Sequence, residues 1–228
     1  MGSKKKLVKF AENLTFKHLF QPTYDEVKDN FSMKGKWNHE FFKNDNPIVL
    51  ELACGKGEYT VGLAEKYPDK NFIGIDYKGA RLWRGAKTSH ESKMNNVAFV
   101  RTKIQLINKI FAKNEVDEIW ITFPDPQPKK TNKRLTSPKF LSKYSKIIKM
   151  DGLFHLKTDS LLLFDYTLEV IEQANHNLVE AIKDLYNNAD FDEVKSIKTH
   201  YEKLFSEQGF SINYLKFSLN PLMYTDEK

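Results

Sequence analysis

The sequence Ile48-Val-Leu-Glu-Leu-Ala-Cys-Gly-Lys-Gly57 is the strongest indication of the fold of this 228-residue chain. Its first five residues form a short apolar run that is typical of a buried strand. Gly55 and Gly57 allow a tight turn and a close approach of a ligand to the backbone, and residues 58–66 then continue at helical spacing. A strand, a glycine-rich turn and a helix in this order predict a nucleotide-binding unit in an α/β sheet.

On either side of this unit, predicted strands and helices alternate. Strands are expected at 48–52, 71–76, 97–100, 118–123, 153–158, 179–185 and 212–219. Helices are expected at 58–66, 79–94, 106–111, 137–150, 161–174 and 199–208. The pattern predicts an α/β fold with a doubly wound, mainly parallel Rossmann-like sheet of about seven strands and an antiparallel C-terminal edge. Residues 1–43 lack clean periodicity and are interpreted as an N-terminal extension that docks on the core domain, residues 44–228.

Composition limits the classes of function. The formal net charge is +6, and lysines and arginines recur from Lys129 to Lys149 without matching acids, which indicates an anionic partner such as nucleic acid. Because Cys54 is the only cysteine, we expect a reducing, cytoplasmic environment. No long uncharged apolar run is present, so no membrane association is expected.

The first half of the chain carries a candidate cofactor site. Asp76 ends the second predicted strand about 20 residues beyond the glycine turn, the usual distance for a carboxylate that binds a ribose. This spacing alone fits NAD, FAD or S-adenosylmethionine. Thr60 replaces the third glycine of the dinucleotide fingerprint. The acid Glu51 would repel a diphosphate, but it would favour a cationic sulfonium or bind loop amides.

The second half carries a candidate substrate site. The apolar run that begins at Glu118 stops at Pro124, Pro126 and Pro128, which predicts a stiff, extended exit from the sheet around Asp125. Basic residues follow at once, and Asp159 ends the next predicted strand. The cluster Thr199-His-Tyr-Glu202 is either part of this site or a helix-capping box.

In this order, the motifs resemble those of bacterial tRNA (guanine-N(7))-methyltransferases. The shared elements are Glu51 with Gly55-x-Gly57, Asp76, Asp125-Pro-x-Pro-Lys-Lys130 with Arg134-Leu-Thr136, His155-x-Lys-Thr-Asp159, and Thr199-x-Tyr-Glu202. The resemblance covers roughly residues 48–217. It implies a class I methyltransferase fold, S-adenosylmethionine as methyl donor, no metal, and the guanine at position 46 in the variable loop of tRNA as substrate.

The resemblance also implies roles for individual residues. Donor-binding positions correspond to Glu51, Gly55, Gly57, Asp76, Lys103 and Asp125, and Asp125 is also the implied catalytic residue. Substrate-binding positions correspond to Lys129, Asp159, Thr199, His200, Tyr201 and Glu202, and the RNA-contacting loop corresponds to Thr131, Asn132, Lys133 and Arg134. The implied partner is tRNA, and the sequence leaves both a monomer and a homodimer open.

Three positions depart from the family pattern. Ala53 replaces the first glycine of the loop, which a methyl group can occupy if φ is negative there. Gln127 stands where many members have Trp. Lys103 stands where an Asn or Asp often contacts adenine, and because a lysine cannot accept a hydrogen bond, Thr102 or backbone groups are alternatives for that contact.

The implied chemistry needs few catalytic groups. Guanine N(7) has an in-plane lone pair and no proton, so methyl transfer depends on positioning and electrostatics rather than on a general base. Asp125, with Asp159 as a competing candidate, is expected to hold the guanine edge. An NAD-dependent dehydrogenase, a non-catalytic RNA-binding module and a methyltransferase for another substrate are the alternative functions.

Overall fold

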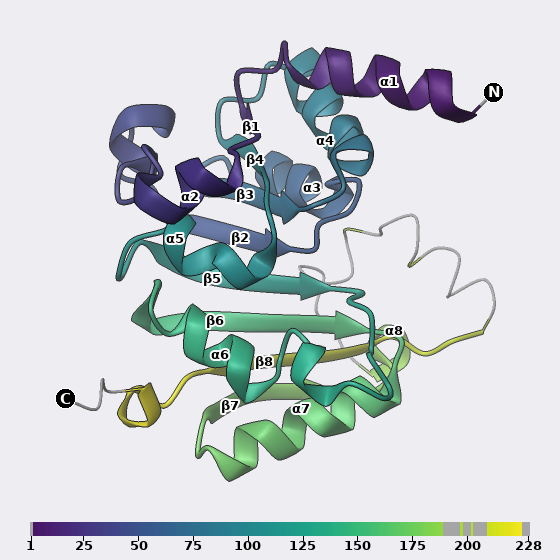
Figure 1. The fold of residues 1–228 in the computed structure, drawn as a ribbon. Coiled ribbons are helices and arrows are strands. Elements are labelled where there is room, and N and C mark those ends of the chain that lie inside the picture. The colour runs from purple at the N-terminus through teal and green to yellow at the C-terminus, as the bar shows by residue number, and fades with distance from the viewer. Residues whose placement is uncertain (1, 189–196, 198–201, 203–208, 225–228) are drawn as a thin grey trace. The chain divides into compact units, whose positions relative to one another are not determined.

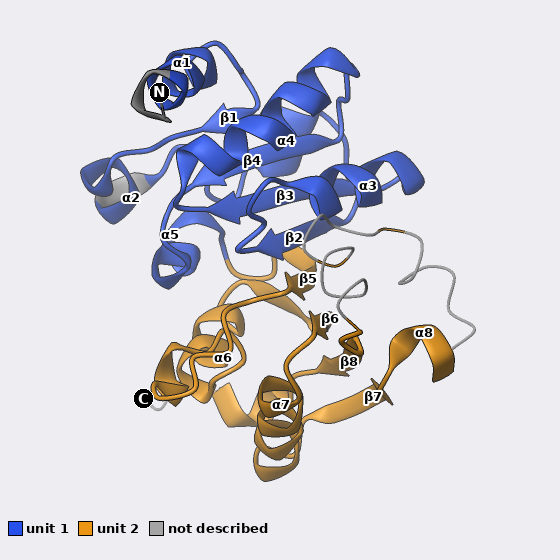
Figure 2. Ribbon diagram, turned by 90° about the vertical axis from the view of Figure 1, so that its right-hand side faces the viewer, with its two compact units in different colours: residues 1–112 blue, residues 113–228 orange. Residues whose placement is uncertain are grey.

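The computed structural model describes residues 2–188, 197, 202 and 209–224, and the chain divides into two compact units, residues 1–112 and 113–228 (Figure 2). The strands of the first unit are β1 (Leu19–Phe20), β2 (Ile48–Leu52), β3 (Asn71–Asp76) and β4 (Val97–Arg101). They lie in the order β1-β4-β3-β2 and are all parallel. Every residue of β2 and β3 is buried, as expected for parallel strands covered on both faces.

The helices of the first unit follow its strands. After each of β2, β3 and β4 comes one helical segment, namely α3 (Glu58–Lys66), α4 (Gly79–Glu91), and η2 (Ile104–Leu106) with α5 (Ile107–Ile110). Phe99 of β4 packs at the centre of this layer, and a Cβ at Gly57, Gly74 or Gly85 would overlap its ring. These glycines therefore let the helices and the loop approach the sheet closely.

The N-terminal segment is regular where no periodicity was expected. It forms α1 (Gly2–Asn13), β1, α2 (Tyr24–Asn30) and a π-helical turn, η1 (Trp37–Phe42). Helix α1 lies against α4 (Figure 1), and β1 adds a strand beside β4. Trp37 is fully buried, and its ring stacks on Phe111 with centroids 5.7 Å apart. The division into an extension and a domain at residue 43 stays a prediction.

The second unit contains the antiparallel edge. Its strands are β5 (Val116–Thr122), β6 (Ile148–Thr158), β7 (Asn177–Ile182) and β8 (Asn213–Ser218). Strand β6 pairs parallel with β5, and β8 lies antiparallel between β6 and β7. The helical segments are η3 (Thr131–Lys133), α6 (Pro138–Tyr144), α7 (Leu161–Gln173), α8 (Leu185–Asn188) and η4 (Pro221–Tyr224).

The predicted fold class is confirmed, with corrections in detail. The described residues form eight strands rather than about seven because the short β1 was not predicted. The helix predicted at 137–150 is wrong in its second half: α6 ends at Tyr144, and β6 begins at Ile148. The helix predicted at 199–208 lies outside the described residues apart from Glu202. Among the helices that the structure describes, none is long and apolar enough to span a membrane.

Candidate active site

The glycine loop after β2 has an unusual backbone. Ala53, Gly55 and Gly57 all have positive φ, at 59°, 57° and 69°. A negative φ, the condition stated for a methyl group at this position, is therefore not met, and the methyl group of Ala53 is accommodated in the left-handed region at a cost of about 1–2 kcal/mol. Such strain is typical of loops whose conformation serves a ligand rather than stability.

The two glycines of the loop have different environments. A Cβ at Gly57 would lie 2.6 Å from the Phe99 ring, so this glycine is required for packing. A Cβ at Gly55 would find only the Ala53 carbonyl oxygen, at 3.9 Å. Gly55 thus faces open space, and its bare backbone fits the close approach of a ligand.

Glu51 is bound to the helix that follows the loop. Its carboxylate is 3% exposed and accepts hydrogen bonds from the backbone N–H of Thr60, at 2.8 Å, and from the Thr60 hydroxyl. An acid at the first turn of α3 is stabilised by the unpaired amides and by the helix dipole. The sequence suggested amides of the loop as partners of Glu51, whereas the amide that its carboxylate accepts here belongs to Thr60 in the first turn of α3.

Asp76 connects the ends of two strands. Its Oδ2 accepts the N–H of Gly55 at 3.0 Å, and its Oδ1 accepts the N–H of Lys78 at 2.8 Å. The carboxylate is thereby fixed against the glycine loop, with 6% of the residue exposed. Burial, with Glu51 and Asp76 nearby, raises the pKa of the Cys54 thiol well above its usual range, which fits a packing residue rather than a nucleophile.

A cavity of about 790 Å³ opens beside Asp76, within the first unit. Tyr77, Thr102 and Lys103 line it from the ends of β3 and β4, and residues 21–24 and 27 line it from the N-terminal segment. Lys103 is exposed, whereas Thr102 is largely buried. The predicted donor-binding residues of this unit therefore gather at the carboxyl ends of β2, β3 and β4.

In the second unit, Asp125 lies on a tight turn just beyond β5. The chain leaves the strand through Phe123, with φ at 48°, and turns again at Gln127, with φ at 45°, so it is not simply extended as predicted. Asp125 is exposed, and its Oδ1 accepts the N–H of Gln127 at 3.0 Å. One carboxylate oxygen therefore fixes the turn.

The basic loop that follows contains two kinds of cation. Lys129, Lys130 and Lys133 are exposed, as are Thr131 and Asn132. Arg134 is only 4% exposed; its Nε donates to the Pro126 carbonyl oxygen at 2.9 Å, and its guanidinium lies 4.2 Å from the Tyr166 ring centroid. Arg134 thus ties the loop to α7, while the lysines face solvent.

Asp159 follows β6 at the same edge as Asp125. Thr122 of β5 is paired with Lys157 of β6, so the two strand ends that carry these acids are adjacent. Asp159 is half-buried. The structure therefore brings the two competing acids to neighbouring positions of one sheet edge.

Beneath this edge lies a buried ion pair that the sequence did not reveal. Lys157 Nζ lies 2.6 Å from Glu202 Oε1, both side chains are fully buried, and the Tyr186 hydroxyl donates to the same oxygen. Of the predicted substrate-binding residues 199–202, only Glu202 lies within the described residues; Thr199, His200 and Tyr201 do not. A lysine inside a predicted strand, as in His155-Leu-Lys-Thr158, was the available signal for this pair.

Comparison with known proteins agrees with this geometry. A family model described as "Putative methyltransferase" matches residues 45–215. The tRNA (guanine-N(7)-)-methyltransferase of Christiangramia forsetii is 55% identical over 96% of this chain and 100% of its own length. The protein of the same description from Bacteroides fragilis is 52% identical over 95% of this chain and 86% of its own length.

Solved structures share the fold at low identity. The 16S rRNA methyltransferase KamB matches with a TM-score of 0.62 at 13% identity, covering 80% of this chain and 92% of its own. A 16S rRNA (adenine(1408)-N(1))-methyltransferase from Catenulisporales acidiphilia, solved with S-adenosylmethionine, matches with a TM-score of 0.59 at 12% identity, covering 82% and 92%. At these identities the likeness establishes the fold alone.

Proposed function

The chain belongs to the tRNA (guanine-N(7)-)-methyltransferase family, and from this premise we propose that it transfers a methyl group from S-adenosylmethionine to N(7) of the guanine at position 46 of tRNA. The observation that carries the proposal is the 55% identity to a relative of that description over that relative's whole length. S-adenosylmethionine supplies an electrophilic methyl group on a sulfonium. The residues of this chain bind the two reactants and orient them.

The residues of the first unit fit the donor. Gly55 leaves its backbone open to a ligand, and Asp76 is fixed beside it with a carboxylate suited to ribose hydroxyls. The neighbouring cavity is large enough for the adenosine end, where the Thr102 hydroxyl is a better acceptor than the Lys103 ammonium. Glu51 is proposed to act through Thr60, because its carboxylate orients α3 and the loop.

The residues of the second unit fit the guanine and its RNA. Asp125 is proposed to accept hydrogen bonds from the guanine N1–H and exocyclic amine, or to stabilise the positive charge that develops on the purine. Asp159, at the adjacent strand end, is the competing residue for the guanine edge. Lys129, Lys130 and Lys133 are exposed and suited to phosphate contacts, whereas Arg134 supports the loop from below.

The decisive experiment is a product analysis. The protein is incubated with unmodified tRNA and labelled S-adenosylmethionine, and the digested nucleosides are separated. We expect label in 7-methylguanosine, and a tRNA with another base at position 46 should accept none. Label in a different nucleoside, or none at all, would contradict the proposal.

A further inference from the structure

We propose that α1 and the N-terminal half of α4 form a second RNA-binding surface, which contacts the phosphate backbone of the tRNA substrate. The surface, called here the α1–α4 basic surface, consists of Lys5, Lys6, Lys9, Lys78, Arg81 and Arg84. The inference rests on the proposed tRNA-methylating function and extends it, because it assigns RNA contacts to a region outside the 129–134 loop.

The charge of this surface is unbalanced. The acids of the two helices are Glu12 in α1 and Glu91 in α4, and both contact Lys87, at 2.9 and 3.9 Å. None of the six basic side chains forms an ion pair with a carboxylate within the part of the chain that the structure describes. All but Lys9 are exposed, so their charges are available to an external anion.

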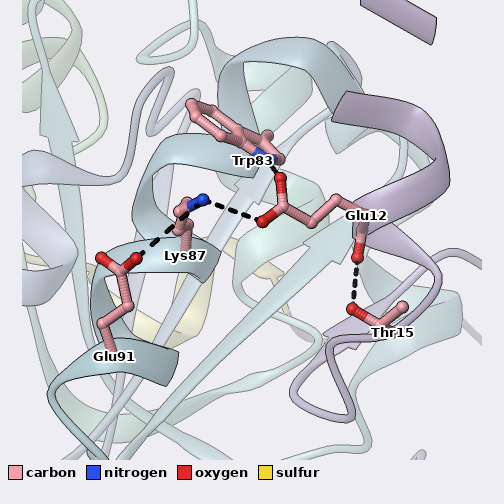
Figure 3. Close-up of polar contacts among 5 residues, drawn as sticks. All are labelled: Glu12, Thr15, Trp83, Lys87 and Glu91. Carbon is pink, nitrogen blue, oxygen red and sulfur yellow. Dashed lines mark hydrogen bonds and ion pairs between the residues drawn. The ribbon is translucent and has the colours of Figure 1, made fainter. Parts of the chain in front are cut away.

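The two helices are fixed to each other by specific hydrogen bonds. The Glu12 carboxylate accepts from the Trp83 indole N–H at 2.6 Å and from the Lys87 ammonium (Figure 3). Those bonds from Lys87 and Trp83 lower the pKa of Glu12 and thus favour its ionised form. Asn13 of α1 donates to the Gly79 carbonyl oxygen at 2.9 Å. The basic residues of α1 are therefore held next to those of α4 before any ligand binds.

Aromatic rings, rather than acids, orient several of the cations. Lys9 Nζ lies 4.4 Å from the Trp83 ring centroid, and Lys6 Nζ lies 5.7 Å from that of Phe10. The Arg101 guanidinium lies 5.1 Å from the centroid of the same Phe10 ring. A cation–π contact positions an ammonium group without neutralising it, so the field of the surface is retained. Basic side chains interleaved with rings are typical of nucleic-acid-binding surfaces.

The surface adjoins the donor-binding end of the first unit. Lys78 is two residues beyond Asp76, and its own N–H donates to the Asp76 carboxylate. Arg101, which contacts Phe10 of α1, also donates to the Tyr77 carbonyl oxygen at 3.4 Å, and Tyr77 lines the cavity beside Asp76. RNA bound to the α1–α4 basic surface would thus lie beside the edge where the methyl donor is proposed to bind.

Phosphate of RNA fits this surface better than a lipid membrane. Among the described residues of α1, the large apolar side chains that are exposed are Leu7 and Val8, whereas Phe10 packs against Arg101. Two such residues provide too little apolar area for an interfacial helix. The charges are instead spread over two helices, which suits a polyanion that crosses both.

The test compares two quadruple variants in the otherwise intact chain. One variant, Lys5→Gln/Lys6→Gln/Arg81→Gln/Arg84→Gln, neutralises the surface. The matched control, Lys28→Gln/Lys34→Gln/Lys36→Gln/Lys109→Gln, removes four exposed lysines elsewhere in the same unit. For each protein, the Kd for unmodified tRNA is measured between 50 and 200 mM salt, together with the affinity for S-adenosylmethionine and the formation of 7-methylguanosine.

We expect the first variant to bind tRNA at least tenfold more weakly at 100 mM salt. Its plot of log K against log salt should be less steep by roughly 0.7–0.9 for each phosphate that the variant no longer neutralises. Donor affinity and kcat at saturating tRNA should be retained, whereas the KM for tRNA should rise. The control should behave like the wild type.

The inference is overturned if the salt slope of the first variant is unchanged or falls equally in the control. If the wild-type protein binds anionic vesicles and the first variant does not, while that variant keeps its affinity for tRNA, the surface binds a membrane instead of RNA. Both results are distinct from failure of the proposed function, which would appear as absence of 7-methylguanosine with the wild-type protein itself.

Discussion

Lys157 and Glu202 form an ion pair at 2.6 Å in which both side chains are fully buried. Lys157 also donates to the Ile197 carbonyl oxygen at 3.4 Å, and Tyr186 donates to Glu202. Burial, with Glu202 as hydrogen-bond partner, raises the pKa of Tyr186 far above its usual range. The pair therefore links Lys157 of β6, two residues before Asp159, to Glu202. Glu202 belongs to the motif that the sequence assigns to substrate binding.

Removing one partner should therefore be costly. Lys157→Met leaves a buried carboxylate without its cation, and we expect a loss of about 3–5 kcal/mol in the free energy of unfolding, measured by urea denaturation. The double variant Lys157→Met/Glu202→Leu removes both charges and should regain most of that loss. If the double variant loses as much stability as Lys157→Met and Glu202→Leu lose in sum, when each is measured alone, the ion pair is not the source of the effect.

The strain at Ala53 predicts a stabilising substitution. Because Ala53 has φ at 59°, Ala53→Gly should relieve left-handed strain and raise the free energy of unfolding by about 0.5–1 kcal/mol, after the added entropy of the unfolded chain is subtracted. Ala80→Gly in α4 is the control and should destabilise by about 1 kcal/mol. A loss of stability in Ala53→Gly would contradict the strain.

The two loop glycines should respond differently to alanine. At Gly57 the new methyl group would overlap Phe99, so Gly57→Ala should lose several kcal/mol of stability. At Gly55 the methyl group enters open space, so Gly55→Ala should lose only about 1–2 kcal/mol but bind S-adenosylmethionine at least tenfold more weakly. Calorimetric titration measures the donor affinity, and urea denaturation measures the stability. If the donor affinity of Gly55→Ala is unchanged, Gly55 does not contribute to the donor site.

The fold was predictable where local signals agree with the tertiary structure. The bounds of β2, α3 and β3 match their predictions because an apolar run, a glycine turn and helical spacing all point the same way. The helix predicted for residues 145–150 was wrong because Ile147 and Ile148 suit a helix and a strand equally. The pairing of Ile148 with Val116 of β5 stabilises the strand.

The geometry of the candidate site was predictable only in part. The positions of Asp76 and Asp125 at the ends of strands were predictable because spacing and proline pattern are local properties of the sequence, whereas their functional roles stay predictions. The positive φ of Ala53, the burial of Arg134 and the partner of Lys157 depend on contacts between distant segments. The periodicity of the sequence does not indicate such contacts. A basic loop residue such as Arg134 is therefore predicted to lie on the surface, although the structure buries it.

Arg134 and its neighbour Lys133 allow a direct test of the difference between a buried, structural cation and an exposed cation that binds RNA. Arg134→Ala removes the bond to the Pro126 carbonyl oxygen and the contact with Tyr166, and it should cost about 2 kcal/mol of stability. Lys133→Ala should leave stability unchanged but flatten the salt dependence of tRNA binding by about 0.7–0.9 in log–log slope. The assignment is wrong if Arg134→Ala is as stable as the wild type, or if Lys133→Ala keeps the full slope.

Asp125→Asn should separate the chemical role of this residue from its structural one. Asparagine retains an Oδ1 that can accept the Gln127 N–H, so the turn and the stability should persist. It carries no negative charge, and its amide cannot accept from both guanine donors. We expect kcat/KM for tRNA to fall about 100- to 1000-fold, measured with labelled donor.

The same assay on Asp159→Asn decides between the adjacent acids. If kcat/KM falls in Asp159→Asn but not in Asp125→Asn, Asp159 is the residue that binds the guanine edge. This alternative is open because the two acids follow paired ends of β5 and β6. Donor affinity is measured for both variants by calorimetry. If Asp125→Asn lowers donor affinity as much as it lowers kcat/KM, its carboxylate serves the donor rather than the base, since a purely catalytic loss leaves ground-state binding unchanged.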